Sequence, residues 1–276
     1  MKTWKIQPAD PTIARYIDCY WLLEKNNSDI GLSNPKLNPD PAGHLILIQS
    51  GQPYLYEDSI RSDQGMGSHL ILPHSRTLSM DHSQPFLIMG IKFRVGALYA
   101  LKLPTIEPLL DQVIPIDLTR LFQSGILDEK KIQTLALKAP KSCQEYLDSV
   151  FAPLLSKIVD DKHSILVSRA LASFPQTKLS DLGKILHCSQ RTIERSFMRV
   201  TGLTLKQYHS MERLEALLAY LHKQNAKEIV WADIAFQFGF SDQPHLVRYL
   251  KNSIGHTPGE YARERDLVID AYGDFE

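Results

Sequence analysis

The stretch from Phe238 to Glu264 reads FGFSDQPHLVRYLKNSIGHTPGEYARE, and its pattern is typical of a tight turn followed by an amphipathic helix. Gly239 stands where a preceding helix has to stop in a left-handed conformation, which glycine adopts without steric cost. Ser241 stands at the position of a helix N-cap, and Pro244 falls in the first helical turn, where its missing N–H costs little. The stretch therefore predicts a helix-turn-helix unit.

A second copy of this unit lies upstream, at residues 179–202. An offset of 52 residues aligns Ser189 with Ser241, and beyond the turn an offset of 53 aligns Arg195 with Arg248. We assign the extra residue to the start of the later copy's last helix. His187 takes the place of the turn glycine, and histidine tolerates a left-handed conformation better than most residues. A duplicated unit explains this agreement better than chance does.

The second helix of each predicted unit has a polar face opposite its apolar face. Arginine and glutamine are side chains that reach guanine and adenine edges in the major groove of DNA. A solvated surface is the alternative, and the repetition of the pattern in both copies favours DNA binding. The candidate DNA-binding residues are Gln190, Arg191, Glu194, Arg195, Asp242, Gln243, His245, Arg248 and Lys251.

Between the two copies, an apolar stripe from Leu205 to Leu221 predicts one continuous helix. Its length of about 18 residues corresponds to roughly 27 Å at the rise of an α-helix. Such a spacer can hold two recognition helices about one DNA turn apart, ~34 Å, on one face of the duplex. Double-stranded DNA, read in two adjacent major-groove segments, is the expected partner.

The charge distribution gives modest support for a polyanionic partner. Residues 160–265 hold 15 Lys+Arg and 11 Asp+Glu, whereas residues 1–159 hold 16 of each and the tail 266–276 holds four acids. The chain has 276 residues and three scattered cysteines without a CxxC pair, which predicts a reducing, cytoplasmic location without disulfides. We expect no export signal and no membrane span, because no apolar run approaches ~20 residues.

The pattern along the chain predicts an α+β protein with two domains. Residues 1–104 are β-rich, with short apolar runs at 44–49, 53–57, 69–73 and 86–93 separated by turn residues, which indicates an antiparallel barrel or sandwich. Residues 105–159 have helical spacing and predict a connector that either forms a dimer interface or packs on the β-rich domain. Residues 160–265 are helical throughout, and 266–276 form an acidic tail.

The β-rich half contains a candidate effector pocket and no recognisable catalytic motif. Phosphate loops, nucleophile elbows and HExxH motifs are missing from the sequence. Its four histidines between 44 and 82 lack the spacing of a metal site, so we expect structural roles for them and no cofactor, metal or catalysis. The candidate pocket residues, each of which is equally explained as ordinary core, are Tyr54, Tyr56, His69, Phe93 and Arg94.

Residues 160–265 resemble the DNA-binding region of the AraC/XylS family of transcription regulators. The resemblance rests on LSDLGKILHCSQRTIERSFMRVTG and on VWADIAFQFGFSDQPHLVRYLKNSIGHTPGEYAR. It implies two helix-turn-helix subdomains joined by a long helix, with both recognition helices in the major groove. The implied base-reading residues are Arg191, Glu194 and Arg195 in the first copy and Gln243, His245 and Arg248 in the second. The sequence departs from the family pattern at Pro244 and Leu246, and Glu194 brings an acid to the groove.

The N-terminal half more weakly resembles the cupin-like sensor domains that are fused to some regulators of this family. Such domains bind a small effector, dimerise, or do both. The resemblance therefore implies a transcription regulator, and we expect an activator that contacts RNA polymerase and forms a homodimer. A cupin-type enzyme fused to a DNA-binding module and a ligand-independent architectural DNA binder remain as alternatives.

Overall fold

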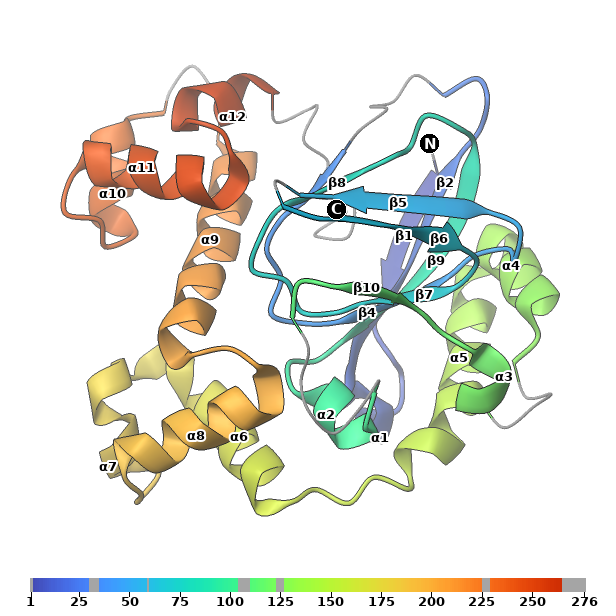
Figure 1. Ribbon diagram of the computed structural model, residues 1–276, viewed down its shortest axis with the longest axis horizontal. Helices are drawn as coiled ribbons and strands as arrows, with labels where there is room; N and C mark the ends of the chain where they lie inside the picture. The colour runs from blue at the N-terminus through green and yellow to red at the C-terminus, as the bar shows by residue number, and fades with distance from the viewer. Residues whose placement is uncertain are drawn as a thin grey trace.

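The computed structural model describes residues 2–29, 35–58, 60–103, 110–122, 127–224 and 229–264. The acidic tail predicted at 266–276 lies outside the described residues. A β-rich part and a helical part lie side by side (Figure 1), and an extended segment around residues 156–161 connects them. The predicted α+β architecture with two domains is confirmed.

Two antiparallel sheets form the β-rich part. The six-stranded sheet has the order β1-β2-β9-β4-β7-β10, with β1 at Lys2–Ile6, β2 at Ile17–Lys25, β9 at Phe86–Phe93, β4 at His44–Leu47, β7 at His69–Ile71 and β10 at Val113–Pro115. The four-stranded sheet has the order β3-β8-β5-β6, with β3 at Lys36–Leu37, β8 at Leu78–Met80, β5 at Pro53–Glu57 and β6 at Ser62–Met66. The short helices are α1 at Pro11–Ala14, α2 at Ala97–Leu101 and α3 at Leu118–Leu121.

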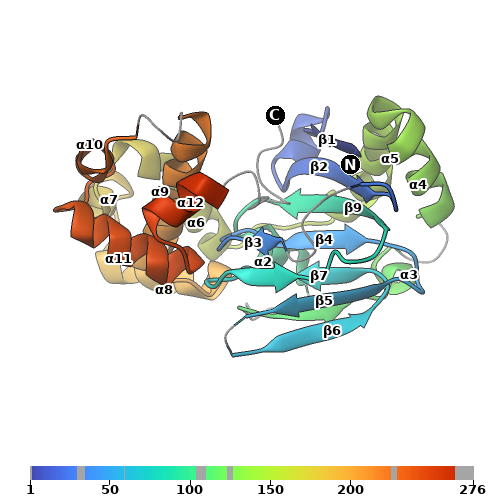
Figure 2. The ribbon, with the colours of Figure 1, turned by 90° about the horizontal axis from the view of Figure 1, so that it is seen from above.

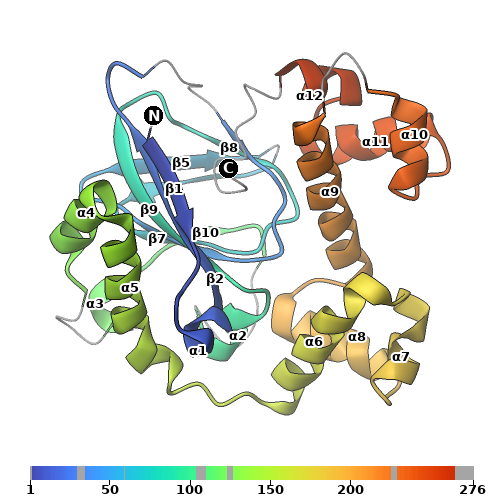
Figure 3. The same cartoon turned by 180° about the vertical axis from the view of Figure 1, so that it is seen from behind.

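Each face of the six-stranded sheet is buried against a different partner. One face shares a core with the four-stranded sheet, in which Trp21 and Ile46 pack with Tyr56. The other face is covered by α4 at Glu129–Lys138 and α5 at Pro140–Leu155, as Figure 2 and Figure 3 show. Leu147 and Phe151 of α5 are fully buried there. The stripe of the helical connector therefore packs on the β-rich domain, and that stripe is not free to form a dimer interface.

Residues 113–115 correct one prediction. They fall in the segment that was predicted to be helical, yet they form β10, which pairs antiparallel with β7 and aligns Val113 with Ile71. Periodicity alone does not distinguish a short apolar run in a helix from one in a buried strand. The sheet therefore extends beyond residue 104, where the β-rich domain was predicted to end. Residue 104 itself lies in the segment 104–109, which is outside the described ranges.

The helical part contains only helices and the turns between them within the described ranges, and its long helix α9 agrees with the predicted helix from Leu205 to Leu221 within the usual uncertainty of helix ends. It consists of α6 at Lys162–Ser173, η1 at Phe174–Gln176, η2 at Leu179–Asp181, α7 at Leu182–Ile185, α8 at Gln190–Thr201, α9 at Leu205–Lys223, α10 at Trp231–Gln237, α11 at Gln243–Ile254 and α12 at Pro258–Glu264. Helix α9 joins two groups of helices (Figure 1), each with its own core. Phe197 lies in the first core and Leu246 in the second.

Candidate nucleic-acid interface

The two helix-turn-helix units, α7–α8 and α10–α11, repeat the same backbone geometry. His187 has a φ of +53° and its counterpart Gly239 a φ of +72°, so both turns pass through the left-handed region. Helix α8 ends at Gly202 with a φ of +73°, and α11 ends at Gly255 with a φ of +76°. Agreement at both the turn and the helix end confirms the duplication.

The N-caps of the two recognition helices differ. Ser189 caps α8, and its hydroxyl accepts a hydrogen bond from the Thr192 N–H at 3.1 Å, as predicted. In the later unit the cap is Asp242, whose carboxylate accepts from the His245 N–H at 2.7 Å, so the assignment of Ser241 was wrong. The extra residue lies in the turn and not in the helix. A carboxylate at this end is also favoured by the helix dipole.

Five of the nine candidate residues present side chains that are free to contact DNA. Their side chains are exposed and make no hydrogen bond or ion pair within the described part of the chain. An exposed guanidinium or amide that is not already paired can bind a base edge or a phosphate without first breaking an internal contact. The five are Arg191, Arg195, Gln243, Arg248 and Lys251.

The other four candidates are engaged inside their own units. Gln190 is half-buried and donates from its amide to the Glu194 carboxylate at 3.2 Å. Asp242 serves as the N-cap described above. His245 is half-buried, its Nδ1 lies 3.2 Å from the Ser241 hydroxyl, and its ring packs edge-on against Phe240. These contacts give the four residues structural roles that sequence spacing alone did not indicate.

Helix α9 holds the later unit through contacts that sequence reasoning missed. The Arg213 guanidinium lies over the rings of Phe240 at 4.2 Å and Tyr249 at 4.8 Å, in cation–π geometry. The Tyr249 hydroxyl also donates to the Ser210 carbonyl of α9. These residues are far apart in sequence, so no local pattern predicts their meeting. Together they fix the orientation of α11 relative to α9.

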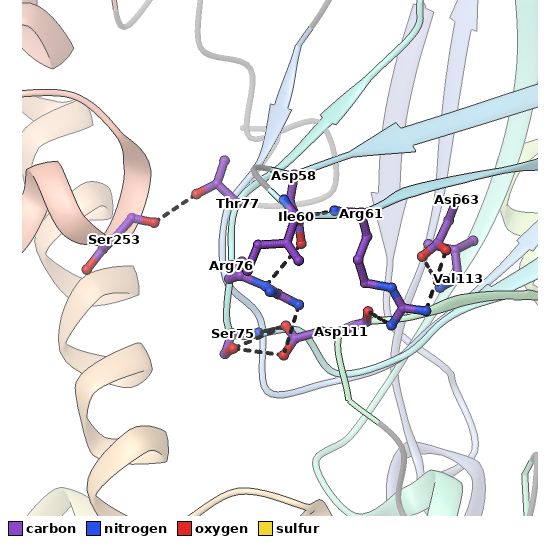
Figure 4. A network of polar contacts seen from close by, with 10 residues as sticks. All are labelled: Asp58, Ile60, Arg61, Asp63, Ser75, Arg76, Thr77, Asp111, Val113 and Ser253. Atoms are coloured by element: carbon purple, nitrogen blue, oxygen red, sulfur yellow. Dashed lines mark hydrogen bonds and ion pairs between the residues drawn. The ribbon is translucent and has the colours of Figure 1, made fainter.

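The β-rich domain contacts both units. In the first unit, Arg199 at the end of α8 donates to the Tyr99 hydroxyl of α2 at 3.1 Å. Beside the later unit, the Thr77 hydroxyl donates to the Ser253 carbonyl at 2.9 Å, which Figure 4 shows. These contacts involve the C-terminal ends of the recognition helices, so they leave the exposed arginines uncovered.

The five candidate pocket residues divide between two cavities. Tyr54, Tyr56 and His69 line a cavity of about 390 Å³ between the strands of the four-stranded sheet and β7. Phe93 and Arg94 instead border a cavity of about 490 Å³ between the β-rich and helical parts. The prediction of one shared pocket is therefore wrong, because it took residues from separate cavities.

Phe93 and Arg94 have structural roles. Phe93 is buried and packs edge to face against Phe151 of α5. The Arg94 guanidinium pairs with the Asp18 carboxylate at 3.1 Å and donates to the Ala14 carbonyl at 2.7 Å. Both side chains therefore already have partners within the protein.

The histidines of the β-rich domain have mostly structural partners. The His44 ring contacts the Asp40 carboxylate at 3.1 Å, and the His74 ring contacts the Asn38 and Leu72 carbonyls. Burial lowers the pKa of both rings. Among the described residues, no cluster of three or more His, Cys, Asp or Glu side chains is arranged to hold a metal.

Comparisons with known proteins bear on both parts of the chain. The helix-turn-helix domain family matches residues 182–264. The C-terminal part of the chain is an AraC-type helix-turn-helix domain. Residues 5–115 match a domain of unknown function, DUF6597. Within the described ranges, no helix is both long and apolar enough to cross a membrane.

Two curated relatives match part of this chain. The uncharacterized HTH-type transcriptional regulator YidL of Escherichia coli is 28% identical over 102 residues, which cover 37% of this chain and 33% of YidL. The bifunctional transcriptional activator/DNA repair enzyme AdaA of Bacillus subtilis is 32% identical over 94 residues, covering 34% of this chain and 43% of AdaA. The matched segment thus spans less than half of each relative.

The solved structures that match most of the chain are distant from it in sequence. ToxT from Vibrio cholerae is 11% identical with a TM-score of 0.44, covering 95% of this chain and 98% of ToxT. The AraC-like transcriptional activator CuxR is 13% identical with a TM-score of 0.26, covering 79% and 86%. These similarities are too distant to define a ligand or a partner.

Proposed function

We propose that this chain is a sequence-specific DNA-binding transcription regulator that reads two adjacent major-groove segments. The observation that carries this proposal is the repeated unit, in which each recognition helix exposes at least one arginine side chain without a partner among the described residues. Arg191 and Arg195 of α8, with Gln243 and Arg248 of α11, are the proposed base-reading residues. Lys251 lies further along α11, and we assign it to a phosphate, where a flexible point charge suffices.

Selection of bound sequences from random DNA tests this proposal. A base-reading protein is expected to enrich one site and to bind it about 10³-fold or more tightly than random sequence at physiological salt. Running the selection with and without cell-extract metabolites also tests whether an effector changes binding. A ratio near one would instead support an architectural DNA binder.

The domain boundary near residue 160 leads to a separate prediction. The helical part has two cores of its own, so a fragment of residues 160–276 is expected to fold and to protect a DNA site. The measurement is circular dichroism of the fragment, followed by footprinting on the selected site. An unfolded fragment would show that the β-rich domain is required to complete the first core, against which Val95, Tyr99 and Leu110 pack.

The β-rich domain is the proposed regulatory element, and β8 connects it to the later unit. Met80, at one end of β8, lines the 390 Å³ cavity. Thr77, just before the other end, contacts Ser253 (Figure 4), and Lys36 of the paired strand β3 contacts His256 at 2.6 Å. A shift of this short strand on ligand binding would alter the docking of α11.

Neighbouring side chains hold the segment before Thr77 in place. Arg76 pairs with the Asp58 carboxylate at 3.0 Å and lies 3.7 Å from Asp111. Ser75 donates from both its backbone N–H and its hydroxyl to the same Asp111 carboxylate (Figure 4). These contacts anchor the residues just before Thr77, so a displacement of β8 would act on the hydrogen bond between Thr77 and Ser253.

Replacing Thr77 with valine is expected to loosen this docking. Loss of one neutral hydrogen bond should increase opening of the later unit roughly 2- to 10-fold, measured as faster amide deuterium exchange in residues 251–258. Thr134→Val is the matched control, because its hydroxyl also donates to a backbone carbonyl, that of Lys130, far from α11. Equal exchange in the two variants would argue against a docking role for Thr77.

Several finer parts of the proposal follow from the family resemblance. We infer an activator that contacts RNA polymerase, acts in the cytoplasm and forms a homodimer through a surface other than the buried stripe of α5. Light scattering of the purified protein tests the dimer, and transcription from the selected site tests activation. The alternative of a fused enzyme predicts turnover of small acids or sugars, and we expect none.

A further inference from the structure

The 390 Å³ cavity of the β-rich domain has walls of closely packed aromatic rings. The rings of Tyr54 and His69 lie 3.9 Å apart between centroids, and those of His82 and Phe86 lie 4.2 Å apart. Tyr56 completes the first group, with its ring 5.3 Å from His69. Aromatic walls with a few polar groups are typical of sites for small organic molecules.

Part of this wall is closed to hydrogen bonding with a ligand. His69 lies between the Gly67 carbonyl, 2.9 Å from its Nδ1, and the Tyr56 hydroxyl, 2.8 Å from its Nε2. Burial lowers the pKa of His69 to about 4, so the ring is neutral at pH 7. In that state Nδ1–H donates to the carbonyl and Nε2 accepts from the hydroxyl. The polar groups of His69 and Tyr56 therefore already form hydrogen bonds with each other, and these two side chains mainly offer aromatic surface to a ligand.

Two other polar side chains of the cavity, those of Tyr54 and His82, have no such hydrogen-bond partner within the described ranges. His82 is 7% exposed and Tyr54 is 9% exposed. Neither the His82 ring nor the Tyr54 hydroxyl makes a hydrogen bond within the described ranges, and both lie at the cavity wall. Neither group is among the fully buried, unpartnered polar atoms of the described residues, so both are open to the cavity. These two groups are the ones that a bound molecule would satisfy.

The charge of the lining restricts the ligand. No lysine, arginine or glutamate is found among the described lining residues, and Asp81 is exposed and accepts from the Ser83 N–H at 2.9 Å. Lys25 lies outside the cavity lining, and its ammonium group donates a hydrogen bond to the backbone carbonyl of His82 at 2.6 Å. Burial lowers the pKa of the His82 ring to about 4, so this ring is neutral as well. An ionised ligand would lose its hydration without gaining a buried partner of opposite charge.

We propose that this cavity binds an uncharged aromatic molecule whose hydrogen-bonding group is held between Tyr54 and His82. The ligand's ring stacks on the aromatic walls, and its polar edge accepts from the Tyr54 hydroxyl and exchanges a hydrogen bond with the His82 imidazole. This inference rests on the proposed regulatory role of the β-rich domain and specifies the effector that the domain takes.

Calorimetric titration of the full chain, without DNA, tests the ligand class. The probes are para-hydroxyacetophenone, its anionic counterpart para-hydroxybenzoate and the cation phenyltrimethylammonium. The neutral probe is expected to bind about tenfold or more tightly than either charged probe, because only the charged ones are desolvated without compensation. Tighter binding of the anion or the cation, or no binding of the neutral probe, would overturn the proposal.

Two variants locate the binding at this cavity. His82→Phe keeps an aromatic ring and removes its nitrogens, so about tenfold weaker binding of the neutral probe is expected. In Gly65→Ala the new Cβ would lie 2.4 Å from the Tyr54 hydroxyl and displace it, so weaker binding is expected there too. His209→Phe, on the exposed face of α9, is the control.

Unchanged affinity in both cavity variants would place the ligand elsewhere and overturn the assignment. The melting temperature of each variant shows whether it remains folded. If only one of the two cavity variants is folded, its affinity for the neutral probe is compared with that of the control. DNA binding is measured on the same preparations. Failure of the ligand test with intact DNA binding rejects this inference alone, whereas loss of sequence preference for DNA rejects the proposed function.

Discussion

The double variant Arg195→Ala, Arg248→Ala is expected to lose roughly 2–6 kcal/mol of binding free energy on the selected DNA site, or about 30-fold to 20,000-fold in affinity. Each arginine is exposed, lacks a partner within the described chain and occupies the same place in its own unit. The two lie in separate units with separate cores, so their effects should add. Competition binding at fixed salt measures the loss.

The single variants distinguish base reading from phosphate binding. Arg248→Ala alone should cost on the order of 1–3 kcal/mol and relax sequence preference at one position. Arg120→Ala is the matched control, since Arg120 is exposed on α3 of the β-rich domain. A loss of equal size on every DNA sequence would show that Arg248 binds a phosphate.

Phe197→Ala is expected to destabilise the first helix-turn-helix unit by about 3–5 kcal/mol. The Phe197 side chain is 0% exposed and packs edge to face against Phe174 and Tyr208, so its removal leaves a cavity at the centre of that core. The later unit has its own core around Leu246 and should keep its structure. Urea unfolding followed by circular dichroism measures the loss, and limited proteolysis shows which unit opens.

Met198→Ala is the control for this effect, because Met198 is the next residue of α8 and is 42% exposed. A surface substitution of this kind typically changes stability by less than about 0.5 kcal/mol. If the two variants unfolded at the same urea concentration, Phe197 would not be the centre of the first core.

The helical part was predictable because its signals are local. Apolar spacing and turn residues lie within a few positions of one another, and the duplication allowed one copy to support the other. His187 shows the strength of this comparison, since only its alignment with Gly239 indicated a left-handed turn. The cap was misassigned because Ser241 and Asp242 are adjacent and both residue types are good N-caps, so geometry had to decide between them.

The β-rich part was less predictable because its contacts join residues far apart in sequence. Strand β10 depends on pairing with β7, which no local pattern encodes. Tyr54 and His69 lie on strands of different sheets, and they meet only because those sheets share a core. His82 was set aside as a structural histidine, and its burial beside a cavity became visible only in the folded chain. Pocket membership is a property of the tertiary arrangement.

A hydroxyl-radical footprint on the selected DNA site tests the central claim most directly. Two recognition helices joined by α9 should protect two segments about one helical turn apart, ~34 Å, on the same face of the duplex. Arg195→Ala should weaken protection of one segment and Arg248→Ala protection of the other. A single continuous protected segment that both variants weaken equally would contradict the account of two reading helices.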